Sequence, residues 1–206
     1  LMHEALRRVL GEHVQQKGSL VDADKLRFDF SHTQSLSANE LSRVSQLVNE
    51  QIRHNSEVLT QEMEMDAAIE AGATALFGEK YGDAVRVLTM GSERFSVELC
   101  GGTHVARTGD IGVFRILNER GVAAGVRRIE AVTGIGALSD IAKVDKVVAD
   151  ICDVVKSSPE SAADKVTSLR VEVREIEKQI TQLKQKLATG AGADLTSEAV
   201  DVMGFK

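Results

Sequence analysis

Apolar and polar positions repeat in two different ways along the chain. Up to Gly134, several short segments alternate every second residue, as in Leu26–Ser31, which is typical of half-buried β-strands. Other segments repeat every three or four residues, which predicts amphipathic helices. Strands and helices follow each other irregularly, without a regular βαβ repeat. We therefore expect an α+β fold with a mixed or antiparallel sheet and packed helices.

The predicted elements follow these periodicities and the turn and cap residues between them. A capping box, Ser37-Ala38-Asn39-Glu40, marks the start of one helix. We expect helices at residues 3–14, 38–52, 66–76, 137–156 and 159–189. We expect strands at residues 15–21, 25–31, 57–65, 85–90, 95–99, 112–118 and 125–132.

The last third of the chain has only helical periodicity. Its apolar positions step alternately by four and three residues, which is a heptad seam: Ala162, Val166, Leu169, Val173, Ile176, Ile180, Leu183 and Leu187. A break at Ser157–Glu160 separates two long helices, which predicts an antiparallel, coiled-coil-like helical hairpin. The expected domains are thus 1–134, a helical arm at 135–189, and a glycine-containing linker with the start of an incomplete domain at 190–206.

Composition excludes several classes of protein. The 206 residues are 43% hydrophobic and 27% charged, enough for a core in one or two domains. Aromatic residues make up only 3% and the net charge is −6, which disfavours stacking platforms for single strands, basic DNA-binding tails and polybasic membrane anchors. No uninterrupted run of about 18 apolar residues would span a bilayer. Two cysteines and no signal peptide indicate a reducing cytoplasm.

The negative total hides an uneven distribution of charge. Residues 57–79 contain six acidic residues and no basic one, whereas residues 100–134 contain five arginines and three acidic residues. Within the second stretch, Arg127 and Arg128 are adjacent on a predicted strand and point to opposite faces. One could contact phosphate, which suits the planar arginine fork, or both could pair with glutamates such as Glu130. Ordinary variation of surface charge also accounts for the pattern.

The segment Cys100-Gly101-Gly102-Thr103-His104 carries the most specific chemistry. A predicted strand delivers Cys100, and His104 follows four residues later across two glycines. A thiolate and an imidazole at this spacing can share one tetrahedral Zn²⁺, with two further ligands from elsewhere. Two other interpretations stay open. The pair could be a buried cysteine and a surface histidine, or a cysteine nucleophile with a histidine base.

Several segments together resemble one family, the bacterial alanyl-tRNA synthetases, over essentially the whole chain in order. The resemblance is to the editing domain, the helical arms and the first residues of the C-terminal domain. The segments that carry it are His3–Arg7, His13–Val21, Leu26–His32, Cys100–His104, Thr108–Gly112 and Gly125–Gly134.

The resemblance implies a zinc site and an editing activity. In the family a His-x-x-x-His pair and a Cys-x-x-x-His pair bind the zinc, and Cys100 and His104 match the second pair. The first pair lies just before the Leu-Met-His that opens this chain, so we expect zinc binding and hydrolysis to be impaired in this piece. Gln16 matches a position in the editing pocket. ATP and Mg²⁺ belong to the aminoacylation domain, which is absent here.

Editing has a physical rationale. A pocket for alanine cannot exclude glycine, and it rejects serine poorly, because a small group discriminates by only about 1–3 kcal/mol. A second site must then hydrolyse Ser-tRNA(Ala) and Gly-tRNA(Ala). Zinc could orient the substrate or activate water. Gln16 and Thr103 are the candidate catalytic residues, since a polar group must pair with the serine hydroxyl.

The expected partner is the acceptor end of tRNA(Ala). Its candidate contacts are Arg107, Arg127 and Arg128. The heptad helix would be a spacer or a dimerising arm, with a homodimer formed through it or through the C-terminal domain. Two alternative functions remain open: a non-catalytic module that binds tRNA and associates through the coiled coil, and a free-standing deacylase of the editing type.

Overall fold

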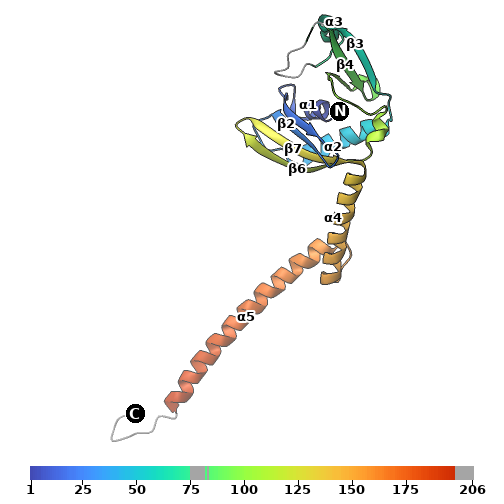
Figure 1. Ribbon diagram of the computed structural model, residues 1–206. Coiled ribbons are helices and arrows are strands. Elements are labelled where there is room, and N and C mark those ends of the chain that lie inside the picture. The colour runs from blue at the N-terminus through green and yellow to red at the C-terminus, as the bar shows by residue number, and fades with distance from the viewer. Residues whose placement is uncertain (75–81, 83, 198–206) are drawn as a thin grey trace. The chain divides into compact units, whose positions relative to one another are not determined.

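The computed structural model describes residues 1–74, 82 and 84–197. It confirms the predicted α+β class: antiparallel sheets with helices, ending in two long helices. The chain divides into two compact units, Leu1–Ala142 and Lys143–Lys206, and the boundary between them falls within one helix, α4 (Gly134–Val155), which Figure 1 labels. Among the described residues, no helix is both long enough and apolar enough to cross a membrane.

The larger sheet has four antiparallel strands in the order β1-β2-β7-β6. These are β1 (Gln16–Val21), β2 (Leu26–Ser31), β6 (Phe114–Ala123) and β7 (Val126–Thr133). The central pair joins β2 to β7, with Phe28 opposite Ile129. Strand β6 is longer than the sequence predicts, because it continues along β7 to a tight turn at Gly125, whose φ of 68° favours glycine.

The smaller sheet has three antiparallel strands, β3 (Leu59–Glu64), β4 (Ala84–Met90) and β5 (Ser96–Leu99). Strands β4 and β5 form a hairpin in which Val87 lies opposite Leu99. The connection contains the short 3₁₀ helix η1 (Ser92–Arg94). Helix α3 (Met65–Glu70) covers this sheet, and a small core forms from Ala68, Val85, Val87 and Leu99.

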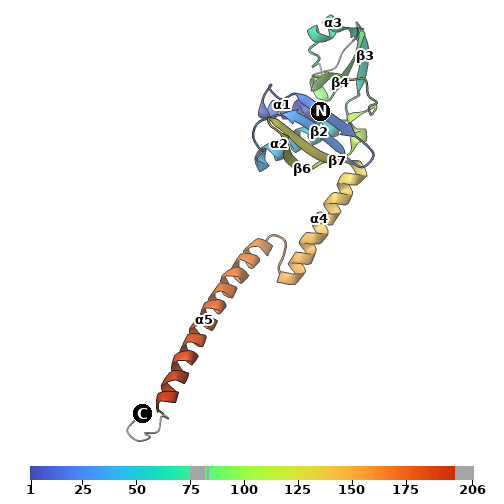
Figure 2. The same ribbon diagram turned by 60° about the vertical axis from the view of Figure 1, so that its left-hand side comes forward.

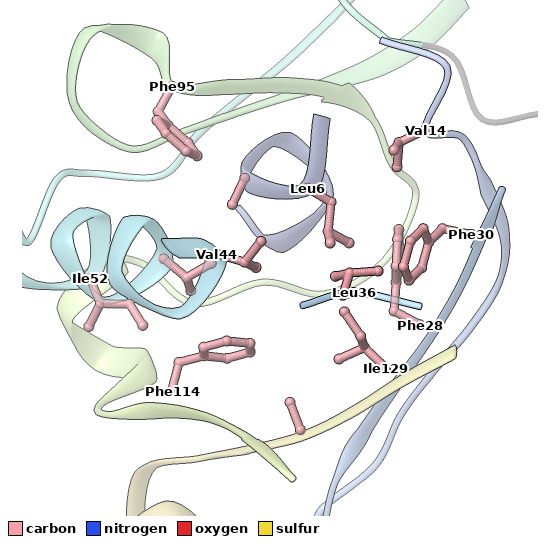
Figure 3. Packing of buried hydrophobic residues seen from close by; sticks show 13 residues of the cluster. Leu6, Val14, Phe28, Phe30, Leu36, Val44, Ile52, Phe95, Phe114 and Ile129 are labelled. Atoms are coloured by element: carbon pink, nitrogen blue, oxygen red, sulfur yellow. The ribbon is translucent and has the colours of Figure 1, made fainter. Parts of the chain in front are cut away.

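Two helices build the main core against the larger sheet. Helix α1 (Met2–Leu10) buries Leu6, and α2 (Ala38–Arg53) buries Val44 on a stripe with the predicted spacing. Figure 3 shows these side chains meeting Phe30 and Ile129 from the sheet. Burying such large apolar side chains contributes about 1.5–3 kcal/mol each, so this core fixes how the helices lie on the sheet.

The last third of the chain forms two long helices, α4 (Gly134–Val155) and, after a break, α5 (Ala162–Ser197). The predicted break is thus present, but α5 begins three residues after the expected start at Pro159. The backbone stays helical through Gly190–Ala193, where the glycines predict a linker; alanine is the best helix former and offsets the cost of a glycine. The expected start of a further domain at 198–206 lies outside the described residues.

Antiparallel pairing of these two helices stays a prediction. Seven apolar residues of the heptad seam, from Val166 to Leu187, are between 37% and 73% exposed. The seam is therefore accessible to a partner. Figure 2 shows α4 and α5 as separate, regular helices.

The capping box of α2 gives the first testable prediction. Ser37 Oγ accepts a hydrogen bond from the Glu40 amide at 3.3 Å, and the Glu40 carboxylate accepts one from the Ser37 amide at 2.7 Å. Ser37→Ala should lower the free energy of unfolding by about 1 kcal/mol, measured by urea denaturation. Ser42→Ala, one turn later on an exposed position, is the control and should have little effect. Equal losses from both substitutions would contradict a specific role for the cap.

Candidate functional site

The loop Cys100–His104 brings two metal-ligating atoms together. Strand β5 ends at Leu99, and Cys100 Sγ lies 3.2 Å from His104 Nε2 after the chain has turned. The separation is close to the edge of a tetrahedral site with Zn–S near 2.3 Å and Zn–N near 2.0–2.1 Å, so the pair can share one ion. The same contact is also compatible with a thiol that donates to a neutral imidazole.

The space beside these two atoms is kept open by Gly102. A Cβ atom at Gly102 would lie 3.6 Å from Cys100 Sγ and 3.7 Å from His104 Nε2. A Cβ atom at Gly101 would have no neighbour within 4 Å. Neither glycine has a positive φ, so turn geometry does not require them. Gly102 is therefore the glycine at which a methyl group would contact both donor atoms, and the thiol and imidazole present fit a zinc half-site.

Arg86 on strand β4 forms hydrogen bonds with the loop at two points. The Cys100 amide donates to the Arg86 carbonyl at 3.1 Å, and Arg86 Nη1 donates to the Gly102 carbonyl at 2.5 Å. Arg86 is not among the site residues predicted from the sequence. A signal was present, however: in a hairpin centred on residue 93, Arg86 falls directly opposite Cys100.

The charges around the loop keep His104 neutral. Partial burial, followed by the nearby positive charges of Arg86 and the Leu1 ammonium, lowers the pKa of His104, while Glu98 acts in the opposite direction. A neutral imidazole is the form that binds metal. A thiolate–imidazolium pair needs the protonated form, so the lowered pKa favours metal ligation over a cysteine nucleophile.

Glu98 forms a negative centre two residues before Cys100. Its carboxylate lies 3.6 Å from His3 Nδ1 and accepts a hydrogen bond from Ser96 at 2.9 Å. Burial acts to raise the pKa of Glu98, but His3 and the Leu1 ammonium outweigh it and lower the pKa to about 2. Because His3 on α1 lies 3.6 Å from Glu98, two residues before Cys100, the beginning of α1 lies near the Cys100–His104 loop.

A cavity of about 350 Å³ adjoins the loop. Thr103 and His104 line one side, and the β1–β2 turn from Val21 to Leu26 lines another. The structure therefore brings Thr103, one of the two candidates for recognising a serine hydroxyl, to a cavity next to the metal-ligating pair.

Gln16, the other candidate, lies on β1 but at the end of that strand far from the cavity. It begins β1, whereas the cavity is lined by Val21 at the opposite end, roughly 16 Å away along an extended strand. Its side chain donates to Ser19 Oγ at 3.2 Å. Gln16 does not line this cavity, and its catalytic role stays a prediction.

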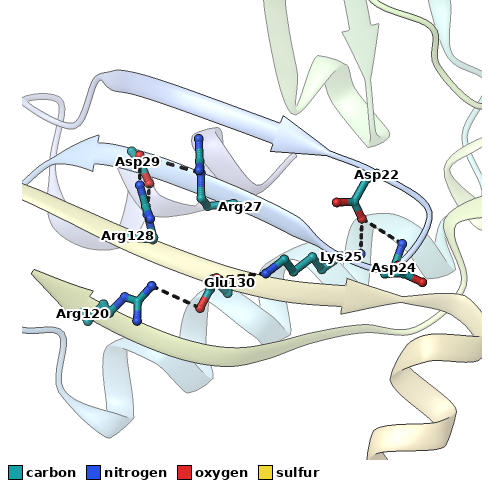
Figure 4. Close-up of polar contacts among 8 residues, drawn as sticks. All are labelled: Asp22, Asp24, Lys25, Arg27, Asp29, Arg120, Arg128 and Glu130. Atoms are coloured by element: carbon teal, nitrogen blue, oxygen red, sulfur yellow. Dashed lines mark hydrogen bonds and ion pairs between the residues drawn. The ribbon is translucent and has the colours of Figure 1, made fainter. Parts of the chain in front are cut away.

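Two of the predicted RNA-binding arginines are engaged by carboxylates of the chain. Arg127 donates twice to Glu119, at 2.6 and 2.9 Å, and Arg128 donates twice to Asp29, at 2.7 and 2.8 Å. The Arg128 hydrogen bond lowers the pKa of Asp29 in spite of burial. Figure 4 shows Arg128 facing Asp29 across the sheet. The arginines thus form cross-strand ion pairs, as one of the two interpretations predicts. Their partners are Glu119 and Asp29, however, and not Glu130.

The third arginine, Arg107, binds Asn55 through both the side-chain and the backbone oxygen. It also precedes η2 (Thr108–Ile111), where the Arg107 amide donates to Asp110 at 2.9 Å. Each predicted contact arginine therefore has a structural partner, and their contact with RNA stays a prediction.

Metal ligands beyond the pair do not gather at the site in the described part of the chain. Within residues 1–74, 82 and 84–197, no group of three or more His, Cys, Asp or Glu side chains is arranged to hold an ion.

Comparison with known proteins identifies the family. Residues 85–130, which include Arg86, Cys100 and His104, match the family described as "Threonyl and Alanyl tRNA synthetase second additional domain". All 206 residues align with alanine–tRNA ligases, at 55% identity in Pseudomonas syringae pv. syringae, 55% in Saccharophagus degradans and 53% in Nitrosomonas eutropha. The chain matches one segment of the alanyl-tRNA synthetases.

The family predicted from the sequence is thereby confirmed. The chain spans about a quarter of the length of these relatives: 24%, 23% and 24%, respectively. The alanyl-tRNA synthetase segment contains the second additional domain, and the Cys100–His104 loop lies inside it.

The two glycines of the loop give a matched test. In the longer protein that includes the family's preceding histidine pair, Gly102→Ala should weaken Zn²⁺ binding by about ten-fold or more, because the new methyl group occupies space beside both donor atoms. Gly101→Ala should leave the affinity unchanged. Competition with a chromophoric chelator measures both, and unchanged binding by the Gly102 variant would show that the ion does not lie there.

Proposed function

We propose that this segment carries the editing chemistry of an alanyl-tRNA synthetase: hydrolysis of Ser-tRNA(Ala) and Gly-tRNA(Ala) at the Cys100–His104 loop. The observation that supports this most directly is the 3.2 Å approach of Cys100 Sγ and His104 Nε2 beside an open space and a cavity. The family match supports the same class of substrate.

Zinc is the proposed metal, with Cys100 and His104 as two of its ligands. When bound, zinc supplies a positive charge that can orient the ester or lower the pKa of water. His3 Nδ1 on α1 lies 3.6 Å from the carboxylate of Glu98, two residues before Cys100, so the beginning of α1 lies near the loop. That placement supports the family's His-x-x-x-His pair as the other two ligands.

Thr103 is the proposed residue for recognising serine. It lines the cavity next to His104, and a hydroxyl there can both donate to and accept from the serine side chain. Alanine lacks that partner, and a site built to hydrogen-bond a hydroxyl rejects an analogue lacking it far better than an apolar pocket rejects an added group.

The proposed activity gives a direct prediction for the longer protein. Cys100→Ala and His104→Ala should each lower kcat/KM for Ser-tRNA(Ala) deacylation by at least about 100-fold, the scale of losing one electrostatic stabiliser. Cys152→Ala removes the second cysteine of the chain, which lies on α4. It is the matched control and should retain activity. Release of serine from the charged tRNA measures all three.

The alternatives give different outcomes. A module that only binds tRNA would show no hydrolysis in the unaltered protein, with tRNA binding unaffected by Cys100→Ala. A thiol enzyme would keep its activity after chelation, whereas the proposed metal site would lose it and recover it with Zn²⁺.

We also propose that α5 associates with a second copy through its heptad seam. The exposed seam alternates β-branched residues with leucine or isoleucine, as coiled coils do. An apolar cleft of about 400 Å³, formed by Val155, Val166, Leu169 and Val173, lies at its start.

Association through α5 predicts a change in oligomeric state. Ile176→Glu places a charge in the middle of the seam and should shift the chain toward monomer in sedimentation equilibrium. Lys178→Glu, also on α5 but two residues away from the seam position, is the control and should not. A monomeric unaltered chain at all concentrations would exclude this interface.

A further inference from the structure

Arg86 on β4 differs in two ways from the described residues of the Cys100–His104 loop. It is bonded to the loop itself, through the Gly102 carbonyl at 2.5 Å, and it carries a permanent positive charge. Gly102 lies two residues before His104 and two after Cys100, so this bond holds the Arg86 charge at the loop.

Within the part of the chain that the structure describes, most of the hydrogen-bonding capacity of Arg86 has no partner. A guanidinium has five N–H donors, and the bond to Gly102 takes one. Glu62 lies opposite Arg86 in the β3–β4 register, yet within the described residues no carboxylate is at ion-pair distance from Arg86. Arg127 and Arg128, in contrast, each bind a carboxylate through two N–H donors, Arg127 that of Glu119 and Arg128 that of Asp29. The side chain is half-buried, so its charge is only partly screened by water.

The chemistry of the substrate indicates what the free donors would meet. An aminoacyl ester sits on the terminal ribose of a tRNA. The only formal negative charge on that nucleotide is its 5′ phosphodiester, which is therefore the anion nearest to the ester. Two parallel N–H groups of arginine match two phosphate oxygens.

We propose that Arg86 binds the 5′ phosphodiester of the terminal nucleotide and thereby places the ester beside Cys100 and His104. This inference rests on the proposed function, since it assigns a residue to the same site. Arg86 contacts the substrate in the ground state and the transition state alike, so its loss should raise KM more than it lowers kcat.

The test uses the longer, zinc-loaded protein and an acceptor-stem minihelix charged with serine. Arg86→Gln should raise KM by about 10-fold, the scale of a charged hydrogen bond, and leave kcat within about two-fold. The dependence of log(kcat/KM) on log[salt] should become shallower by about 0.7, as expected for one lost phosphate contact on a single strand.

Arg94→Gln is the matched control. Arg94 also donates one guanidinium bond to a backbone carbonyl, that of Ala71 at 2.8 Å, but it lies at the turn of the hairpin rather than at the loop. Its substitution should change neither KM nor the salt dependence.

The outcomes separate the possible roles of Arg86. If it only holds the loop, Arg86→Gln will release zinc and lower kcat while the salt dependence stays unchanged, which overturns the proposal. An unchanged KM with zinc retained also overturns it. If the unaltered protein neither binds zinc nor hydrolyses the ester, the proposed function fails first, and that result is seen before any variant is compared.

Discussion

The pairing of β4 with β5 is the constraint on which the candidate site is built. This pairing sets Arg86 opposite Cys100, so the strand neighbour of the thiol also holds the carbonyl of Gly102. The loop is thus fixed at its start by a backbone bond and in its middle by a side chain. With both points fixed, His104 returns to within 3.2 Å of Cys100 Sγ.

The distribution of charge in this domain follows from how its arginines are used. The excess of arginine between residues 100 and 134 does not produce a uniformly positive face, because Arg127 and Arg128 are neutralised across the sheet by Glu119 and Asp29. Such partly buried pairs hold strands in register and are costly to break from one side only. On β4, outside that stretch, Arg86 hydrogen-bonds to the loop at Gly102.

The elements themselves could be predicted closely from the sequence. Strands β2, β4, β5 and β7 lie within one residue of their predicted bounds, because alternation and turn residues are local signals. The capping box of α2 has both predicted hydrogen bonds. The errors have different causes. Strand β6 extends because β7 offers partners, and α5 runs through a glycine pair that on its own predicts a linker. The helix predicted at 3–14 ends already at Leu10, before Gly11 with its φ of 114°.

The sequence by itself determined the α+β class, the two long helices, the family and the Cys100–His104 pair, since each depends on periodicity or on residues within a few positions of one another. Only the tertiary structure decided which side chains share the site. It placed Thr103 at the cavity and Gln16 at the far end of β1, gave two predicted contact arginines to carboxylates, and brought Arg86 and the start of α1 to the loop. Strand register and the packing of helices on sheets set these distances, and both join residues that are far apart in the chain.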